Sequence, residues 1–289
     1  MTSRSAVRVV DAVRTLEGEG FEVRRGFPTA NLDMVDPFLL LDEMGPTDHP
    51  PGGAKGAPDH PHRGFETVTY LLEGAFEHRD SVGNAGRLGP GDVQWMTAGA
   101  GVVHSELPAA ELREHGGRLH GFQLWVNLPA ADKMKPAHYQ EIPAREIPVV
   151  TRDGVTARVI AGEALGTKGA VTTHSPITYV HATLEPGATL TIPAPRSQHA
   201  FAHVFAGRGQ AGGNAKAVAD GQLALFTADG DELTIAADDD SGLDVLLLAG
   251  EPLKEPVARY GPFVMNTRDE IVQAVRDYQE GRLGAISAA

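Results

Sequence analysis

The chain has no cysteine among its 289 residues. This absence excludes disulfide bonds and thiolate ligands, so any metal ion must be held by nitrogen and oxygen atoms. The first residues also lack the apolar core of a signal peptide. Together these two absences predict a cytoplasmic protein.

An excess of basic residues and long apolar runs are missing as well. Against 25 Lys and Arg stand 38 Asp and Glu, which gives a net charge of −13 and argues against direct nucleic-acid binding. The longest apolar run, Val245–Ala249, has the length of one buried strand and is too short to cross a bilayer. We therefore expect neither nucleic acid nor membrane as a direct partner.

Glycine and proline are plentiful, at 34 and 20 residues, and they separate short apolar runs. This punctuation is typical of an all-β protein with many tight turns. The predicted strands are Arg8–Asp11, Phe38–Asp42, Glu66–Leu72, Ala75–Asp80, Asp92–Met96, His120–Asn127, Thr156–Ala161, Ile177–Leu184, Ala200–Phe205, Leu223–Thr227 and Leu243–Leu248. Their spacing favours a sandwich or barrel over alternating strands and helices.

The two halves of the chain resemble each other in their order of strands and turns. Gly89-Pro90-Gly91-Asp92 in the first half has a counterpart in Glu185-Pro186-Gly187-Ala188, which predicts two related β-barrels from an inexact duplication. The stretch Pro129–Pro148 is predicted to connect them, and the glycine- and alanine-rich segment 206–220 to form a loose loop.

One helix is predicted near the C-terminus. Thr267-Arg268-Asp269-Glu270 has the spacing of a capping box, in which a hydroxyl and a carboxylate satisfy the free amides of a first turn. Apolar residues follow at Ile271, Val275 and Tyr278, and Gly281 supplies a stop. We expect this helix to pack on a barrel face without a catalytic role.

Two short motifs carry the chemistry of the chain: His60-Pro61-His62 and His104-Ser105-Glu106. Side chains two apart on a strand point the same way, so two such strands would direct three imidazoles and one carboxylate at one ion. The turn Gly99-Ala100-Gly101 comes just before His104. Glu66 has the same parity as His60 and His62, so parity alone does not decide between Glu66 and Glu106 as the carboxylate.

A His-x-His pair is by itself a weak signal in a chain with 12 histidines; the neighbouring Pro61 and the glycine turn strengthen it. The second half contains no His-x-His and no glycine turn before a His-x-Glu. Its histidines are therefore interpreted as buried or surface residues of a metal-free barrel; they are His174, His181, His199 and His203.

These residues resemble the motifs of the pirin family, members of the cupin superfamily. The first match runs from Gly56 to Gly74 and includes His-Pro-His-Arg-Gly-Phe-Glu-Thr, and the second runs from Gly89 to Glu106. The resemblance extends nearly end to end and is strongest from about Phe38 to Gln140. Generic cupins lack both the extended His-Pro-His run and the His-Ser-Glu.

The resemblance implies an all-β fold of two tandem cupin-type β-barrels, a bicupin, with a C-terminal α-helix. Residues 1–135 would form the metal-binding domain, and residues 136–289 a degenerate, metal-free domain with the terminal helix. One Fe(2+) would be bound by His60, His62, His104 and Glu106, while Glu66 would have a structural or supporting place.

Three imidazoles and a carboxylate do not select iron on chemical grounds, because Mn, Ni, Cu and Zn suit the same donors. Four protein ligands on an octahedral ion leave two adjacent positions for O₂, water or a chelating substrate. Arg63, Gln123 and Trp95 are candidates to orient the ligands.

The resemblance further implies a dioxygenase that cleaves flavonols such as quercetin with O₂. Glu106 would remove the hydroxyl proton, with Glu66 in reserve, and the metal would lower the pKa of the bound hydroxyl. The apolar lining for a planar aromatic substrate would come from Phe65, Val68, Met96 and Leu124. The alternative is a regulatory protein whose iron switches binding to a transcription factor or metabolic enzyme. A metal-binding cupin with an unrelated small substrate is the third hypothesis.

Overall fold

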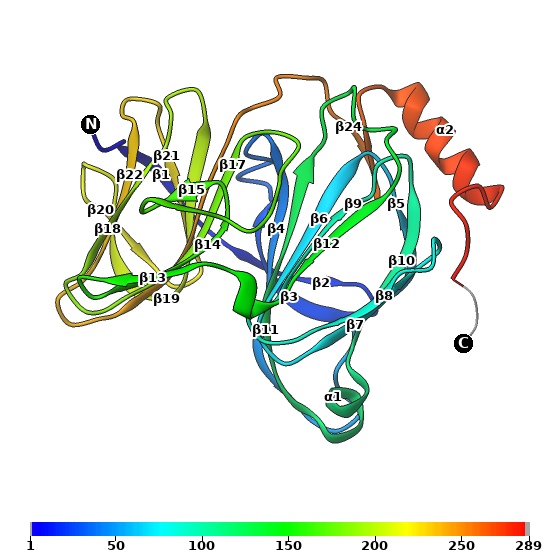
Figure 1. Ribbon diagram of the computed structural model, residues 1–289, viewed down its shortest axis with the longest axis horizontal. Coiled ribbons are helices and arrows are strands. Elements are labelled where there is room, and N and C mark those ends of the chain that lie inside the picture. Colours follow the sequence, from blue (N-terminus) through cyan, green and yellow to red (C-terminus); the bar gives the residue numbers. More distant parts are fainter. Residues whose placement is uncertain (1, 287–289) are drawn as a thin grey trace. The chain divides into compact units, whose positions relative to one another are not determined.

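The computed structural model describes residues 2–286, and strands make up most of them (Figure 1). Two α-helices accompany the strands, α1 (Ala110–His115) and α2 (Arg268–Gln279). Neither of them, nor any other helix in residues 2–286, is long and apolar enough to cross a membrane. The all-β class and the C-terminal helix predicted from the sequence are both confirmed.

The chain forms two compact units, each assembled from separate segments. The first unit comprises Arg14–Arg25, Leu39–Ala144 and Lys254–Ala289, and the second comprises Met1–Val13, Gly26–Phe38 and Arg145–Leu253. This division differs from the expected ranges 1–135 and 136–289. The reason is contact over long sequence separations: β1 (Ala6–Asp11) pairs with β21 (Gln222–Phe226), and Arg63 forms a bridge to Phe263 and an ion pair with Asp277 of α2.

The first unit contains two main antiparallel sheets. The larger has the order β12-β9-β6-β11-β4-β3-β2 and the smaller the order β5-β10-β7-β8. The larger sheet consists of β2 (Val13–Glu17), β3 (Phe21–Phe27), β4 (Phe38–His49), β6 (Phe65–Glu73), β9 (Val93–Thr97), β11 (Gly117–Asn127) and β12 (His138–Ile142). The smaller consists of β5 (Ala57–His62), β7 (Phe76–Asp80), β8 (Ala85–Leu88) and β10 (Val102–Pro108). A hairpin of β24 (Ala258–Tyr260) and β25 (Phe263–Met265) completes the unit.

The main sheet of the second unit has the strand order β1-β21-β19-β23-β17-β14-β13. In addition, β20 and β22 pair with β19, and β18 pairs with β22. Its other strands are β13 (Val149–Arg152), β14 (Val155–Ala161), β17 (Ile177–Leu184), β18 (Thr189–Pro193), β19 (His199–Ala211), β20 (Lys216–Ala219), β22 (Glu232–Ala237) and β23 (Leu243–Gly250). A small hairpin joins β15 (Glu163–Ala164) to β16 (Thr167–Lys168), and a 3-10 turn, η1, covers Ala144–Glu146.

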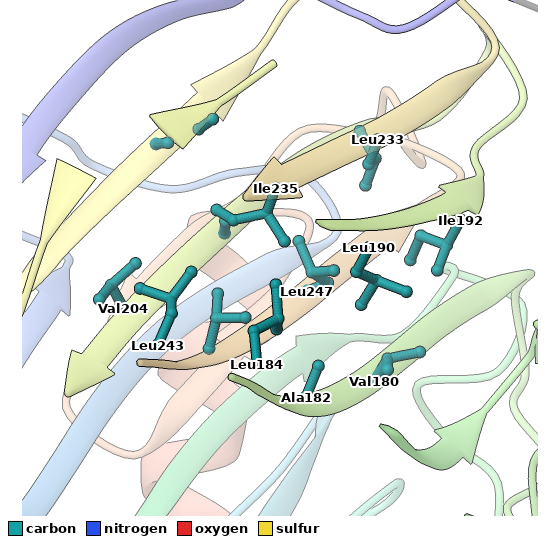
Figure 2. Close-up of a cluster of buried hydrophobic side chains, with 14 of the residues drawn as sticks. Val180, Ala182, Leu184, Leu190, Ile192, Val204, Leu233, Ile235, Leu243 and Leu247 are labelled. Carbon is teal, nitrogen blue, oxygen red and sulfur yellow. The ribbon is translucent and has the colours of Figure 1, made fainter. Parts of the chain in front are cut away.

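Aliphatic side chains fill the core of the second unit. Val180 and Ala182 on β17 lie with Leu190 and Ile192 on β18 and with Leu247 on β23, and their side chains point toward one another (Figure 2). All five are at most 3% exposed. Alternation along these strands turns the inward positions into a continuous apolar core.

Helix α2 begins as its capping box predicts. The Thr267 hydroxyl accepts from the Glu270 amide at 3.2 Å, and the Glu270 carboxylate accepts from the Thr267 amide at 2.8 Å. Ile271 and Ala274 are buried against the β24–β25 hairpin, beside which α2 lies (Figure 1). By its contacts the helix therefore groups with the first unit.

Two segments predicted as connections contain strands. The stretch Pro129–Pro148 includes β12, an edge strand of the larger sheet, and the segment 206–220 includes the end of β19 and all of β20. Glycine and alanine carry little hydrophobic pattern, and short edge strands depend on their partners more than on their own residues. The prediction of a loose loop in the second segment was therefore wrong.

Candidate metal centre

The two motifs lie on neighbouring antiparallel strands of the smaller sheet. His60 and His62 end β5, His104 and Glu106 lie on β10, and the register pairs His104 directly with His60. A register irregularity follows between His104 and Glu106. The strand geometry thus brings together the two motifs, which are more than 40 positions apart in the chain.

The three imidazoles form one group. One ring nitrogen from each of His60, His62 and His104 lies within 4.8 Å of the others, and within residues 2–286 this is the only such group of three potential metal-binding side chains. The Nε2 atoms of His60 and His62 are 3.0 Å apart. Two adjacent ligands at about 2.1 Å from one ion would have about this separation.

Hydrogen bonds determine which ring nitrogen is free in His60 and in His62. Nδ1 of His60 lies 2.7 Å from the carbonyl of Pro58, and Nδ1 of His62 lies 3.4 Å from the carbonyl of Pro262. A carbonyl only accepts, so each Nδ1 carries the proton, which leaves the Nε2 lone pair for a ligand. Two lone pairs that face each other at 3.0 Å repel unless a cation lies between them, so the donor set fits a metal ion.

The protonation states also suit metal binding. Burial, followed by the neighbouring His60, lowers the pKa of His62 well below the usual value. Burial, followed by His62 and His60, does the same for His104. Both rings are therefore neutral near pH 7, the form that ligates metals. Neither ring nitrogen of the fully buried His104 has a hydrogen-bond partner among the described residues.

Glu106, the predicted fourth ligand, lies beside His104. Its Oε2 lies 4.0 Å from Nε2 of His104, and two ligands on opposite sides of one ion would be about 4.2 Å apart. The Thr69 hydroxyl donates to Oε1 at 2.7 Å, and Nε2 of Gln123 donates to Oε2 at 3.2 Å. These two contacts orient the carboxylate.

Glu66 lies elsewhere. It is 1% exposed and accepts a hydrogen bond of 2.7 Å from the Thr97 hydroxyl. Because it is three residues from Thr69 on the same strand, it points to the opposite face of the larger sheet. Its parity with the β5 histidines is not maintained, since residues 63 and 64 separate β5 from β6. The structure therefore does not bring Glu66 together with the imidazoles.

The three residues predicted to orient the ligands have different places. Gln123 contacts Glu106 as expected. Arg63 contacts no imidazole through a hydrogen bond that the structure records; it donates to the carbonyl of Ala100 at 2.6 Å and to Asp277 at 2.8 Å. Trp95 is fully buried on the Glu66 face of the sheet. Only Gln123 thus touches a candidate ligand.

The residues after β5 are held by distant segments that sequence reasoning did not find. Nζ of the buried Lys133 lies 2.6 Å from the Gly64 carbonyl, 2.6 Å from Oδ1 of Asn127 and 3.1 Å from the Val264 carbonyl. Gly64 has φ +88°, and a Cβ there would come within 2.0 Å of the Val264 carbonyl. Glycine is required at this close approach, and no local pattern would have revealed its partner.

Four polar side chains form a row across the inner face of the larger sheet. Strand register places Glu141, Gln94, Thr69 and Gln123 directly opposite one another on β12, β9, β6 and β11. From the smaller sheet, Glu106 contacts Thr69 and Gln123 in this row. His78, cross-strand neighbour of Glu106, approaches Glu141 to 2.6 Å.

A second, less polar row lies beside the first. The register aligns Tyr139, Met96, Thr67 and Trp125 on the same four strands. The Trp125 ring lies 5.3 Å from that of His62, so this row is level with the imidazoles. Met96 and Phe65, whose ring lies 5.1 Å from that of His62, are therefore on the face where the lining was predicted.

Val68 and Leu124 do not belong to this lining. They are paired with each other and alternate with the inward-facing Thr67, Thr69 and Gln123 along their strands. Both are fully buried on the opposite face of the sheet. Strand parity shows which residues share a face, but it does not show which face points inward. Here the contact of Thr69 with Glu106 identifies the inner face.

The histidines of the second unit are not gathered into such a group. His181 and His203 alternate with Val180, Ala182 and Val204, which face the aliphatic core, so the two imidazoles point to the other face of their sheet. His199 is exposed and lies 2.9 Å from the Asp36 carbonyl. The interior of this unit is filled with aliphatic side chains, whereas the first unit contains the group of three imidazoles.

Comparisons with known proteins identify two domains of one family along the chain. The sequence profile described as pirin matches residues 20–126, and that described as the pirin C-terminal cupin domain matches residues 179–284. A pirin-like protein from Solanum lycopersicum is 43% identical over 97% of this chain and 93% of its own length. Pirin from Homo sapiens is 44% identical over 93% of this chain and 90% of its own.

A solved structure is similar along its whole length. The crystal structure of a quercetin 2,3-dioxygenase from Acinetobacter baumannii superposes with a TM-score of 0.92 at 38% identity, and the alignment covers 99% of this chain and 100% of that one. The architecture of two cupin domains in one chain is therefore shared with a protein of known structure.

Proposed function

The chain belongs to the pirin family, and we propose that it is a mononuclear iron dioxygenase that cleaves flavonols of the quercetin type with O₂. The observation that carries the proposal is the group of three imidazoles beside the oriented carboxylate of Glu106. Similarity to a quercetin 2,3-dioxygenase over the full length supports the substrate class. The first unit would be the metal-binding cupin and the second its metal-free partner.

The residues that would hold iron are His60, His62, His104 and Glu106. When bound, the metal would supply a Lewis acid for the 3-hydroxyl and 4-keto oxygens of a flavonol and the redox chemistry that O₂ requires. The same three nitrogens and one oxygen suit Mn, Ni, Cu and Zn, so affinity alone does not choose among them. The expected overall reaction opens the central heterocycle and releases carbon monoxide.

Glu106 would take the proton of the substrate hydroxyl at Oε2, the atom that faces His104. Its neighbours are arranged for either protonation state. The single proton of Thr69 has two acceptors within reach, Oε1 of Glu106 at 2.7 Å and Oε1 of Gln123 at 2.6 Å. Once Oε2 is protonated, a rotated Gln123 amide would accept from it and donate to Thr69, so that every polar atom has a partner.

Solvent exclusion would come from the walls beside the imidazoles. Phe65, Met96 and Thr67 are buried, and His104 is fully covered. A reacting centre shielded in this way protects the deprotonated substrate from water.

The cytoplasmic location expected from the sequence stays a prediction.

The experiment is quercetin consumption in air by protein that has been stripped of metal and reloaded with Fe(II). We expect metal-dependent loss of quercetin that disappears in His104→Ala. His199→Ala, an exposed histidine of the second unit, serves as the matched control and should keep full activity. Iron-loaded protein that leaves quercetin intact would overturn the dioxygenase proposal and leave regulation of a protein partner as the hypothesis to pursue.

A further inference from the structure

Solvent reaches one part of the inner face next to the candidate ligands. On β11, Gln123 and Trp125 are half-buried, whereas Phe122, Leu124 and Val126 on the opposite face are fully buried. His60 is also half-buried, and the Glu106 side chain is 14% exposed. The open side of the metal centre is therefore bordered by β11.

Trp125 is the large side chain on this open border. Its ring lies 5.3 Å from His62 at an interplanar angle of 75° and 4.4 Å from Phe65 at 38°. The other tryptophan, Trp95, is fully buried in the core. Burying an aromatic ring is worth about 1.5–3 kcal/mol, so an indole left half-buried beside a metal centre keeps apolar surface that a ligand can cover.

The position of Trp125 relative to the polar row is as informative as its exposure. Gln123 precedes it by two residues on β11, so both side chains face inward. Gln123 contacts Glu106, and Trp125 contacts His62. A chelating ligand bound at the metal would thus have an aromatic surface on one flank and an amide close to its oxygens.

We propose that Trp125 is the surface on which the planar ring system of the substrate packs while its chelating oxygens bind the metal. Offset or edge-on packing of two aromatic systems adds about 0.5–1.5 kcal/mol beyond the area buried. Trp125 would therefore select extended planar chelators over small ones with the same donor atoms. This proposal rests on the metal site of the proposed function and adds the residue that determines its ligand class.

The test compares two ligands that share the 3-hydroxy-4-keto donor pair, tricyclic 3-hydroxyflavone and monocyclic maltol. Their dissociation constants are measured by titration of Zn(II)-loaded protein, since zinc has no redox chemistry and the ligands stay intact. We expect wild-type protein to bind 3-hydroxyflavone at least about 10-fold more tightly than maltol. Trp125→Leu should remove most of this difference and leave the affinity for maltol within about 2-fold.

Two further variants make the result decisive. Trp125→Phe should keep part of the preference, because it keeps an aromatic ring, and it serves if Trp125→Leu fails to fold. Tyr278→Leu, an aromatic-to-leucine change at an exposed position of α2, should behave as wild type. Equal weakening of both ligands in the Trp125 variants, or no change in either, would overturn the proposal. Because the readout is binding, failure of quercetin turnover alone would sink only the proposed function.

Discussion

Arg63 and Asp277 are 214 positions apart and form a buried ion pair of 2.8 Å within the first unit. Arg63 directly follows His62 and also donates to Ala100, in the turn that precedes His104. Asp277 lies on α2 and accepts in addition from Gln273 at 2.7 Å and Arg282 at 2.6 Å. The C-terminal helix is thereby connected to both strands that carry the candidate ligands.

Replacing Asp277 by Asn should weaken both folding and metal binding. Loss of one partner leaves the Arg63 guanidinium, whose side chain is 6% exposed, without its counter-ion, which costs about 3 kcal/mol. The released Arg63 no longer holds the turn before His104, so we expect Zn(II) affinity to fall by about 10-fold. Chemical denaturation and zinc titration measure the two effects.

Asp269→Asn is the matched control for this helix, since it removes an acidic group from the exposed first turn of α2. It should leave zinc affinity unchanged. If Asp277→Asn lowers stability but binds zinc as wild type does, the ion pair is structural only.

Lys133 should give the protein an unusual pH dependence. Burial lowers its pKa from 10.5 to about 8, although nearby carboxylates act in the opposite direction. The unfolded chain therefore holds this proton up to higher pH than the folded chain does. The unfavourable contribution of the charge is fully present below pH 8 and is lost as the pH rises toward 10.5, so stability increases over that window.

The measurement compares the free energy of unfolding of wild type and Lys133→Met from pH 7 to 10.5. Titrations shared by both proteins cancel in the difference. We expect wild type to gain about 3 kcal/mol relative to the variant across the window. At pH 7 the variant is still expected to be the less stable, because three buried acceptors lose their donor. A difference that does not change with pH would refute the shift.

The two glutamates should separate metal binding from stability. Glu106→Gln removes the proposed anionic ligand beside His104, and we expect metal affinity to fall by about 100-fold with little effect on folding. Glu66→Gln changes a carboxylate that accepts from Thr97 on the other face of the sheet, so it should keep the affinity and lower stability by about 1 kcal/mol. Isothermal titration with Fe(II) under nitrogen and thermal unfolding distinguish the pair; the reverse pattern would exchange their roles.

Arg4 should be essential to the second unit. It is fully buried, and its guanidinium donates to the carbonyls of Gln198 at 2.8 Å, Ala194 at 3.0 Å and Gly230 at 3.2 Å, and also to that of Pro195. Arg4→Met leaves these acceptors without donors, and we expect the free energy of unfolding to fall by about 3 kcal/mol. Zinc affinity of the folded protein should not change, because the candidate ligands belong to the other unit. A loss of zinc affinity in this variant would contradict that separation.

Local features of the chain were readable without a structure. The capping box of α2 depends on atoms three residues apart, and the two ligand motifs depend on alternation along single strands, so their geometry follows from the nearest neighbours in sequence. The same reasoning placed the strands that have strong apolar patterns, such as Ile177–Leu184, at their observed limits. The same reasoning did not predict the edge strands β12 and β20, whose apolar patterns are weak.

By itself the sequence determined the family, the all-β class and the three imidazoles, because each rests on a short, specific pattern. Strand parity alone left Glu66 and Glu106 open as the carboxylate. The tertiary structure puts Glu106, on the smaller sheet, beside the imidazoles, and points Glu66 to the other face of the larger sheet. The contacts of Lys133 and Arg63, and the different exposures of the two tryptophans, were decided there too. Strand register and packing between distant segments create these relationships, so they cannot be derived from neighbouring residues in the sequence.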